Sequence, residues 1–222
     1  MTETAAPLVL RGLYAILDLD ALGGAGLEPV PCARALLEAR PCALQLRAKQ
    51  AHAREALALL EALLPLCRAA EVPLFMNDRP DLALLAGVDG VHLGQDDLPL
   101  AEFRRLLQST GKRLWVGIST HDVAQLREVL DQRPDYVAFG PVFPTRSKQN
   151  PDAVVGLDQL AEVHALTSAA GIPLVGIGGI TRERASAVSC RAESGAVIGD
   201  LLAGGGGEIA ARASELQRLL SA

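Results

Sequence analysis

The amino-acid sequence predicts an α/β protein of the (β/α)8 TIM-barrel class. Short apolar runs alternate with longer Leu- and Ala-rich stretches of helical spacing. Eight such runs occur in 222 residues, which matches the strand number of a barrel. Half of the residues are hydrophobic but only 3% are aromatic, so the core must consist mainly of the aliphatic residues that fill barrel interiors. We therefore expect a single barrel domain over residues 1–222.

Each expected strand is a short apolar run followed by a polar or Gly-rich turn, which is typical of βα units in a parallel sheet. In chain order the strands are Leu13–Leu17, Ala43–Leu46, Leu74–Met76, Gly90–Leu93, Trp115–Ile118, Tyr136–Phe139, Leu174–Ile177 and Ala196–Ile198. The glycines at Gly23, Gly24 and Gly26 do not have GxGxxG spacing, which argues against an open dinucleotide-binding sheet.

Amphipathic stretches between these runs predict helices. They cover Ala51–Ala70, Leu100–Gln108, Gly156–Ala169 and Ile209–Leu220. Asp97-Leu98-Pro99 resembles a capped helix start, with Pro near the first turn.

Charge and composition narrow the class of ligand. With 21 basic and 26 acidic residues the net charge is −5, and no basic patch predicts nucleic-acid binding. No apolar run approaches the roughly 20 residues of a membrane span, and Met1–Pro7 lacks the basic start of a signal peptide.

The four cysteines show no CxxC spacing, so we expect reduced, mostly buried thiols in a cytoplasmic protein. The sequence leaves the oligomeric state open, a homo-oligomer included.

Three polar residues end the second expected strand. Alternation places Gln45, Arg47 and Lys49 on one face of the strand. In a barrel, residues just after the strands line the active face, where Arg and Lys can hold a phosphate. The alternative is a solvated strand end with a surface ion pair.

Two carboxylates follow the third and fourth strands. Asp78 lies in Asn77-Asp78-Arg79, and Asp97 ends Gly94-Gln95-Asp96-Asp97. Mg2+ is commonly held by one or two carboxylates together with substrate phosphates. Either Asp could instead cap a helix, but both together beside Arg47 and Lys49 favour a metal.

The remaining strand ends carry further candidates. Ser119 could donate to a substrate or cap a helix starting near Val123. A loop rich in Pro, hydroxyl and cationic residues covers Gly140–Lys148 and runs on to about Val155, long enough to act as a lid. Paired glycines in Gly176–Ile180 allow backbone N–H groups to approach a phosphate. His92, within the fourth strand, is expected to be a packed histidine.

Taken together, these motifs resemble those of the thiamine phosphate synthase family. They occur in the family's order over nearly the whole chain, and the stretch Asp89–Asp97 is the most specific. The matching segments are Leu13–Asp18, Gln45–Lys49, Asn77–Arg79, Asp89–Asp97, Gly140–Thr145 and Gly176–Ile180.

The resemblance implies a transferase that uses Mg2+. It would condense 4-amino-2-methyl-5-hydroxymethylpyrimidine pyrophosphate with 4-methyl-5-(2-phosphoethyl)thiazole, or its carboxylated form, to give thiamine phosphate and pyrophosphate. In the family, pyrophosphate departs early and leaves a carbocation that the thiazole nitrogen captures. No general base is then required, which agrees with the lack of a His–Asp pair among the motifs.

The resemblance also implies roles for individual residues. Asp78 and Asp97 would bind Mg2+, and Gln45 and Ser119 would face the pyrimidine. The pyrophosphate would be held by Arg47, Lys49, Asn77 and Lys148, and the thiazole phosphate by Thr145, Ser147, Gly179, Ile198 and Gly199. Arg47, Lys49, Ser119 and Lys148 are the candidate catalytic residues.

Three positions depart from the family pattern. Ser147 replaces a frequent Thr but keeps a hydroxyl, and Arg146 replaces a usual Lys. Gly199 stands where the family typically has Ser, and Asp200 follows it. A carboxylate beside a phosphate would be repulsive unless it points away.

Three alternatives remain. A related thiazole tautomerase would lack the metal-binding pattern, whereas this chain retains Asp78, Asp97, Arg47 and Lys148. An isomerase or aldolase barrel would need a strand-end base or a Schiff-base lysine, for which Lys49 is the candidate. A non-catalytic ligand-binding barrel would show a broken set of cations and carboxylates.

Overall fold

Eight parallel strands close into a barrel in sequence order, and β1 pairs with both β2 and β8. The computed structural model describes residues 8–145 and 152–222. The register that closes the barrel pairs Gly12 with Ser194. The strands are β1 (Gly12–Asp18), β2 (Ala43–Arg47), β3 (Leu74–Asn77), β4 (Gly90–Leu93), β5 (Trp115–Thr120), β6 (Tyr136–Phe139), β7 (Leu174–Ile177) and β8 (Ser194–Val197).

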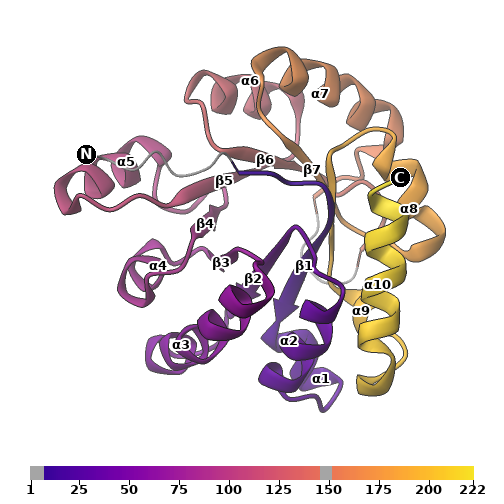
Figure 1. Ribbon diagram of the computed structural model, residues 1–222. Helices are drawn as coiled ribbons and strands as arrows, with labels where there is room; N and C mark the ends of the chain where they lie inside the picture. Colours follow the sequence, from indigo (N-terminus) through magenta and orange to yellow (C-terminus); the bar gives the residue numbers. More distant parts are fainter. Residues whose placement is uncertain (1–7, 146–151) are drawn as a thin grey trace.

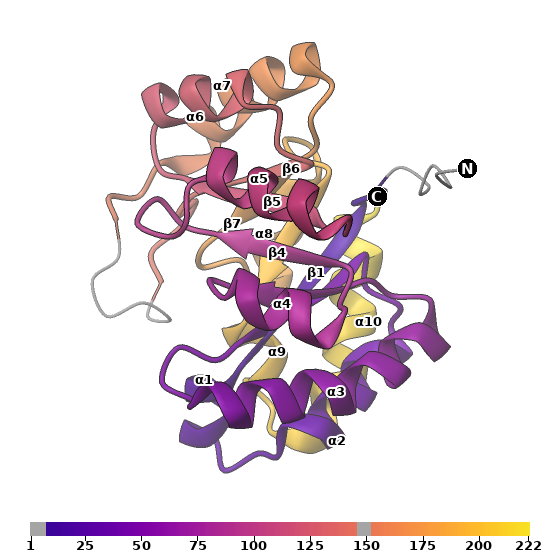
Figure 2. The ribbon, with the colours of Figure 1, turned by 90° about the vertical axis from the view of Figure 1, so that its left-hand side faces the viewer.

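Helices surround this barrel on its outer side (Figure 1). They are α1 (Leu19–Gly24), α2 (Pro29–Glu38), α3 (Ala53–Ala70), α4 (Pro80–Ala86), α5 (Leu100–Thr110), α6 (Val123–Asp131), α7 (Gly156–Ala170), α8 (Arg182–Ser189), α9 (Gly199–Leu202), the 3-10 turn η1 (Gly206–Glu208) and α10 (Ile209–Leu220). Figure 2 shows α3, α4 and α5 along one side of the barrel.

The predicted (β/α)8 class is confirmed, and all eight strands lie at or next to their expected positions. The last strand begins two residues earlier than expected, because Ser194 and Gly195 pair with β1 and β7 although neither residue type favours strands. The four expected helices are present, with ends shifted by at most two residues. A single domain over residues 1–222 stays a prediction.

The interior consists of two separate hydrophobic clusters. Inside the barrel, Tyr14, Phe75 and Tyr136 pack with small aliphatic residues. Between the barrel and its helices, a larger Leu- and Val-rich cluster fills the second layer. A Cβ added at Gly117 would lie 1.9 Å from the ring of Tyr136, so this glycine provides the space for the ring. Three aromatic rings thus occupy the barrel centre, whereas Phe103 and Phe139 belong to the outer cluster.

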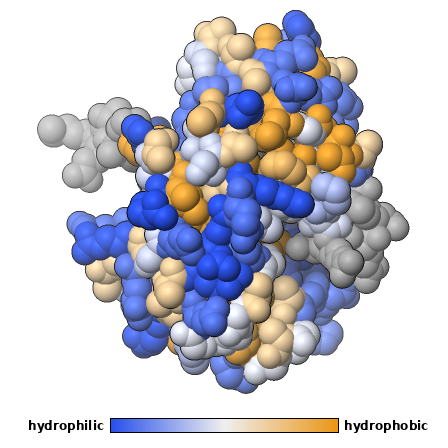
Figure 3. Space-filling model, turned by 90° about the vertical axis from the view of Figure 1, so that its right-hand side faces the viewer, coloured by the Kyte–Doolittle hydropathy of each residue, from blue (hydrophilic) through white to orange (hydrophobic). Residues whose placement is uncertain are grey.

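The outer surface mixes polar and apolar residues. On the side of α8 and α10, hydrophilic residues gather at the centre of the face, with a hydrophobic group above them (Figure 3). None of the helices within residues 8–145 and 152–222 is long and apolar enough to cross a membrane. All four cysteines are free; Cys32 and Cys67 are buried as expected, whereas Cys190 is exposed.

Candidate active site

A cavity of about 1030 Å3 opens at the carboxyl ends of the strands. A pocket for one small ligand is typically about 300–1,000 Å3, so this cavity can accommodate two small molecules. It brings together eleven of the thirteen predicted site residues: Gln45, Arg47, Lys49, Asn77, Asp78, Asp97, Ser119, Thr145, Gly179, Ile198 and Gly199. The other two, Ser147 and Lys148, lie outside the described residues.

Arg47 is held in place by Asp18, the last residue of β1. One carboxylate oxygen of Asp18 forms an ion pair with Arg47 Nη1, and the other accepts a hydrogen bond from Ala21 N at 2.8 Å. Asp18 is 3% exposed, and a buried carboxylate requires such partners. The pair fixes the guanidinium at the cavity wall. Asp18 was missed as a site residue, although it is the only charge in its apolar run.

Asp78 and Asp97 converge beside Lys49. Asp78 has a left-handed backbone conformation, with φ 63°. A hydrogen bond of 2.8 Å from its N–H to the carbonyl of His92 supports this conformation. Its carboxylate lies 3.1 Å from Lys49 Nζ. The pKa of Asp97 is raised, first by burial and then by the Asp78 carboxylate at hydrogen-bonding distance. Two carboxylates this close repel each other, so the arrangement favours a cation between them.

Helix capping does not explain either carboxylate. Helix α4 begins after Arg79 and α5 after Pro99, and neither helix has a side-chain cap. The expected cap by Asp97 is wrong, because its carboxylate turns back to accept from Gly94 N at 2.6 Å. Both side chains thus remain directed at the cavity.

These residues fit a magnesium ion. Residues 8–145 and 152–222 contain no group of three or more His, Cys, Asp and Glu side chains arranged to hold a metal. Mg2+ does not require one, because it retains waters and takes one or two carboxylates plus substrate phosphate oxygens. Asp78 and Asp97 are the side chains that could hold it.

Ser119 does not cap a helix either. The N-cap of α6 is Asp122, whose side chain accepts from Gln125 N at 2.8 Å. The hydroxyl of Ser119 instead lies 2.8 Å from His92 Nε2. His92 is buried, as expected, and burial lowers its pKa to about 4. A neutral histidine therefore supports Ser119 at the cavity wall.

The glycine turn after β7 forms the opposite side of the cavity. Gly178 and Gly179 have φ values of 100° and 61°, and a Cβ at Gly179 would lie 2.4 Å from the carbonyl of Pro144. Arg184 donates to the carbonyl of Gly179 at 2.8 Å and lies 4.8 Å from the centre of the Phe143 ring. This arginine was not predicted from the sequence, and it adds a positive charge to the cavity wall.

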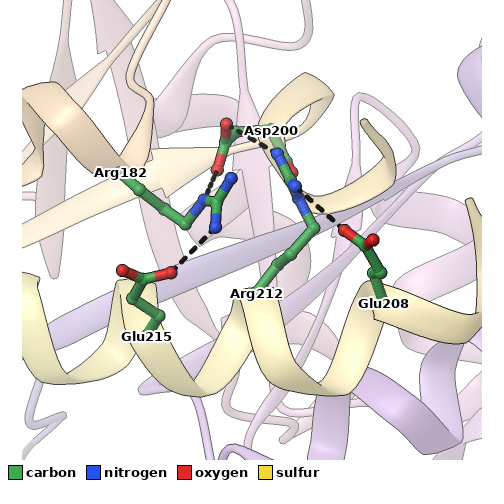
Figure 4. Close-up of polar contacts among 5 residues, drawn as sticks. All are labelled: Arg182, Asp200, Glu208, Arg212 and Glu215. Carbon is green, nitrogen blue, oxygen red and sulfur yellow. Dashed lines mark hydrogen bonds and ion pairs between the residues drawn. The ribbon is translucent and has the colours of Figure 1, made fainter. Parts of the chain in front are cut away.

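Asp200 is turned toward two arginines, as Figure 4 shows. Its carboxylate lies 3.2 Å from Arg182 Nε and 3.1 Å from Arg212 Nη2. Glu215 and Glu208 in turn pair with these arginines at 2.9 and 3.2 Å. The charge of Asp200 is thus partly offset by two arginines, each of which is shared with a glutamate. Because the carboxylate points to these arginines, its repulsion of an anion beside Gly199 is weakened.

The fold and the cavity define a (β/α)8 barrel with a cation- and carboxylate-lined site at the carboxyl ends of its strands. The family model for thiamine monophosphate synthase matches residues 13–201, so the chain belongs to that family. It is 45% identical to a thiamine-phosphate synthase of Koribacter versatilis (strain Ellin345), covering 97% of this chain and 99% of the relative. It is 43% identical to a thiamine-phosphate synthase of Anaeromyxobacter dehalogenans (strain 2CP-C), covering 86% of this chain and 82% of the relative.

A solved structure agrees with the sequence relatives. Thiamine phosphate pyrophosphorylase from Pyrococcus furiosus superimposes with a TM-score of 0.81 and 29% identity, covering 96% of each chain. The similarity therefore extends over the whole barrel and includes the strand ends that form the cavity.

Proposed function

We propose that this protein condenses 4-amino-2-methyl-5-hydroxymethylpyrimidine pyrophosphate with 4-methyl-5-(2-phosphoethyl)thiazole to form thiamine phosphate and pyrophosphate. The observation that carries the proposal is the convergence of Asp78 and Asp97 next to Arg47 and Lys49, opposite the Gly178–Gly179 turn. One side of the cavity suits a pyrophosphate with Mg2+, and the other suits a second phosphate.

The reaction needs charge stabilisation rather than proton transfer. The C–O bond between the pyrimidine methylene and the pyrophosphate breaks, and its electron pair leaves with the pyrophosphate. The thiazole nitrogen then donates its lone pair to the methylene carbon and forms the new C–N bond. Arg47 and Lys49, fixed by Asp18 and Asp78, stabilise the charge that develops on the leaving oxygens.

The other site residues orient the two substrates. Mg2+, held by Asp78 and Asp97, would supply further charge stabilisation at the pyrophosphate. Asn77, which is buried next to Asp78, would hold the pyrophosphate, and Gln45 and Ser119 would face the pyrimidine. Thr145, Gly179, Ile198 and Gly199 hold the thiazole phosphate. Alignment of the two reactants supplies an entropic advantage of about 7 kcal/mol in favourable cases. Lys148 and Ser147, which lie outside the described residues, complete the proposed set.

Two alternatives fit the cavity less well. A Schiff-base lysine has to lose its proton, whereas Lys49 forms an ion pair with Asp78 at 3.1 Å. A tautomerase without a metal would not need two adjoining carboxylates. Mg2+ dependence and a cytoplasmic location belong to the proposal, and a homo-oligomer is compatible with it.

The reaction can be tested by 31P NMR of the purified protein with both substrates and Mg2+. We expect thiamine phosphate and pyrophosphate in equal amounts, and neither product when either substrate is omitted. Absence of thiamine phosphate in the complete mixture would refute the proposal.

A further inference from the structure

A continuous chain of hydrogen bonds crosses the barrel at the floor of the cavity. The amide nitrogen of Gln45 donates to Tyr14 OH at 3.0 Å, and Tyr14 OH lies 2.8 Å from Tyr136 OH. Tyr136 OH lies 2.9 Å from His92 Nδ1, and His92 Nε2 lies 2.8 Å from Ser119 Oγ. The five residues come from β2, β1, β6, β4 and β5, so the chain connects two walls of the cavity.

The inner members of this chain are rigid and neutral. Tyr14 and Tyr136 are 1% and 0% exposed, and His92 is 6% exposed. The rings of His92 and Tyr136 are stacked with centroids 5.6 Å apart. The two ring nitrogens of His92 face the hydroxyls of Tyr136 and Ser119, and a buried imidazolium that lacks an anionic partner is costly. Burial likewise raises the pKa of both tyrosines. Each phenol therefore keeps its one proton, and the imidazole carries a single N–H.

One proton per group fixes the direction of every bond. Because Gln45 donates to Tyr14, the Tyr14 proton points to Tyr136 and the Tyr136 proton points to His92 Nδ1. The N–H of His92 is then on Nε2 and donates to Ser119. The carbonyl oxygen of Gln45 is the amide atom turned away from Tyr14, and the Ser119 proton is available to the cavity.

We infer that this proton order makes Gln45 a hydrogen-bond acceptor and Ser119 a donor, and thereby selects an aminopyrimidine over the corresponding oxopyrimidine. The inference rests on the proposed function. In a 4-aminopyrimidine the amino group and N1 lie at opposite ends of the ring, one a donor and the other an acceptor. They match Gln45 and Ser119 on their separate walls. An oxo group would place its oxygen against the carbonyl of Gln45.

Tyr14, Tyr136 and His92 are thus positioning residues for specificity. Gln45 cannot present its NH2 group to the cavity instead unless every proton in the chain reverses. Removal of the Tyr14 hydroxyl breaks this coupling, and the amide of Gln45 can then turn to either orientation. Specificity would be lost although Gln45 and Ser119 are themselves unchanged.

The proton order can be measured directly on the substrate-free wild-type protein. A long-range 1H–15N correlation spectrum of 15N-histidine-labelled protein, with His92 assigned through His92→Gln, is expected to show the neutral Nε2–H tautomer at neutral pH. The Nδ1–H tautomer or an imidazolium would overturn the inference. This result does not depend on turnover, so it stands apart from failure of the proposed function.

Specificity is measured as the ratio of kcat/KM for the 4-amino and 4-oxo forms of the pyrimidine pyrophosphate. We expect a ratio of about 100 or more in wild type, since an unpaired polar group in a site is strongly rejected. Tyr14→Phe should reduce the ratio by about tenfold. The control is Thr120→Val, which removes a buried hydrogen bond to Ala138 outside the chain and should leave the ratio unchanged. Equal ratios in wild type and Tyr14→Phe would contradict the role of the chain.

Discussion

At the scale of single residues, the two cations of the site form ion pairs with neighbouring carboxylates that orient them. Arg47 reaches the cavity from β2 but takes its orientation from Asp18 on β1, and Lys49 takes its orientation from Asp78 after β3. A buried or half-buried ion pair is costly to break, because the remaining charge loses its partner. Arg47 is therefore preorganised before a substrate binds, whereas the exposed Lys49 is held less firmly.

Replacement of Arg47 should affect one substrate more than the other. We expect Arg47→Ala to raise KM for the pyrimidine pyrophosphate by about tenfold or more, because a charge-assisted contact to phosphate is lost. KM for the thiazole phosphate should change by less than about twofold. The matched control is Arg34→Ala on the exposed face of α2. Equal increases for both substrates would contradict the division of the cavity.

Burial of His92 predicts a pH-dependent stability. Its pKa is about 4 in the folded protein and 6.5 in the unfolded chain, so between these values the unfolded state binds more protons. The free energy of unfolding should thus be highest above pH 6.5 and decrease as pH falls toward 4, by about 3 kcal/mol for this residue.

Urea unfolding in metal-free buffer between about pH 7.5 and pH 4.5 measures this dependence. His92→Gln is the reference, since other titrating groups remain in both proteins. The inference about His92 is wrong if the two proteins lose stability at the same rate over this range.

Residue types and strand-end spacing were enough to predict the charged residues on one side of the cavity. Gln45, Arg47 and Lys49 follow from alternation along one strand, and Asp78 and Asp97 from their places after two others. The supporting partners could not be predicted in this way. Tyr136 lies 122 residues from Tyr14 and 44 from His92, and such pairs become neighbours only once the barrel closes.

At the scale of elements, the packing between β5 and β6 depends on the space left by a glycine. Gly117 on β5 pairs with Tyr136 on β6, and the ring of Tyr136 occupies the space that a side chain at Gly117 would need. The same ring belongs to the hydrogen-bond chain below the cavity. Packing within the sheet is therefore coupled to the site.

A methyl group at Gly117 should destabilise the protein. We expect Gly117→Ala to lower the free energy of unfolding by about 1–3 kcal/mol, the usual cost of overpacking a core. Gly23→Ala in helix α1 is the control, since nothing lies within 4 Å of its added Cβ; it should instead stabilise by about 0.5–1 kcal/mol. Urea denaturation of both variants checks the prediction, and a neutral Gly117→Ala would show that the strands can move apart.

The elements differ in how well the sequence predicts them. Strands and long helices follow from apolar runs and from Leu spacing over Ala53–Ala70. The short helices α1, α4 and α9 have six, seven and four residues, fewer than periodicity needs to be recognised. Tertiary contacts with the barrel, rather than local sequence pattern, define these elements.

At the scale of the whole molecule, the cavity has a charge distribution that the net charge of −5 does not reveal. Arg47 and Lys49 lie on one side with Asp78 and Asp97, and Arg184 lies on the other near the glycine turn. Asp200, which could oppose an anion there, is compensated by Arg182 and Arg212. Barrel closure brings these charges from opposite halves of the sequence into one cavity, and the proposal of two anion-binding regions rests on this arrangement.

The central claim is that this site forms thiamine phosphate with the help of Asp78. It is tested most directly by the rate of thiamine phosphate formation from both substrates with Mg2+, in wild type and in Asp78→Ala. We predict product formation by wild type and a decrease in kcat of about 100-fold or more in the variant, the scale of losing one major electrostatic contribution to the transition state. Undiminished activity in Asp78→Ala, or no product from wild type, would contradict the account.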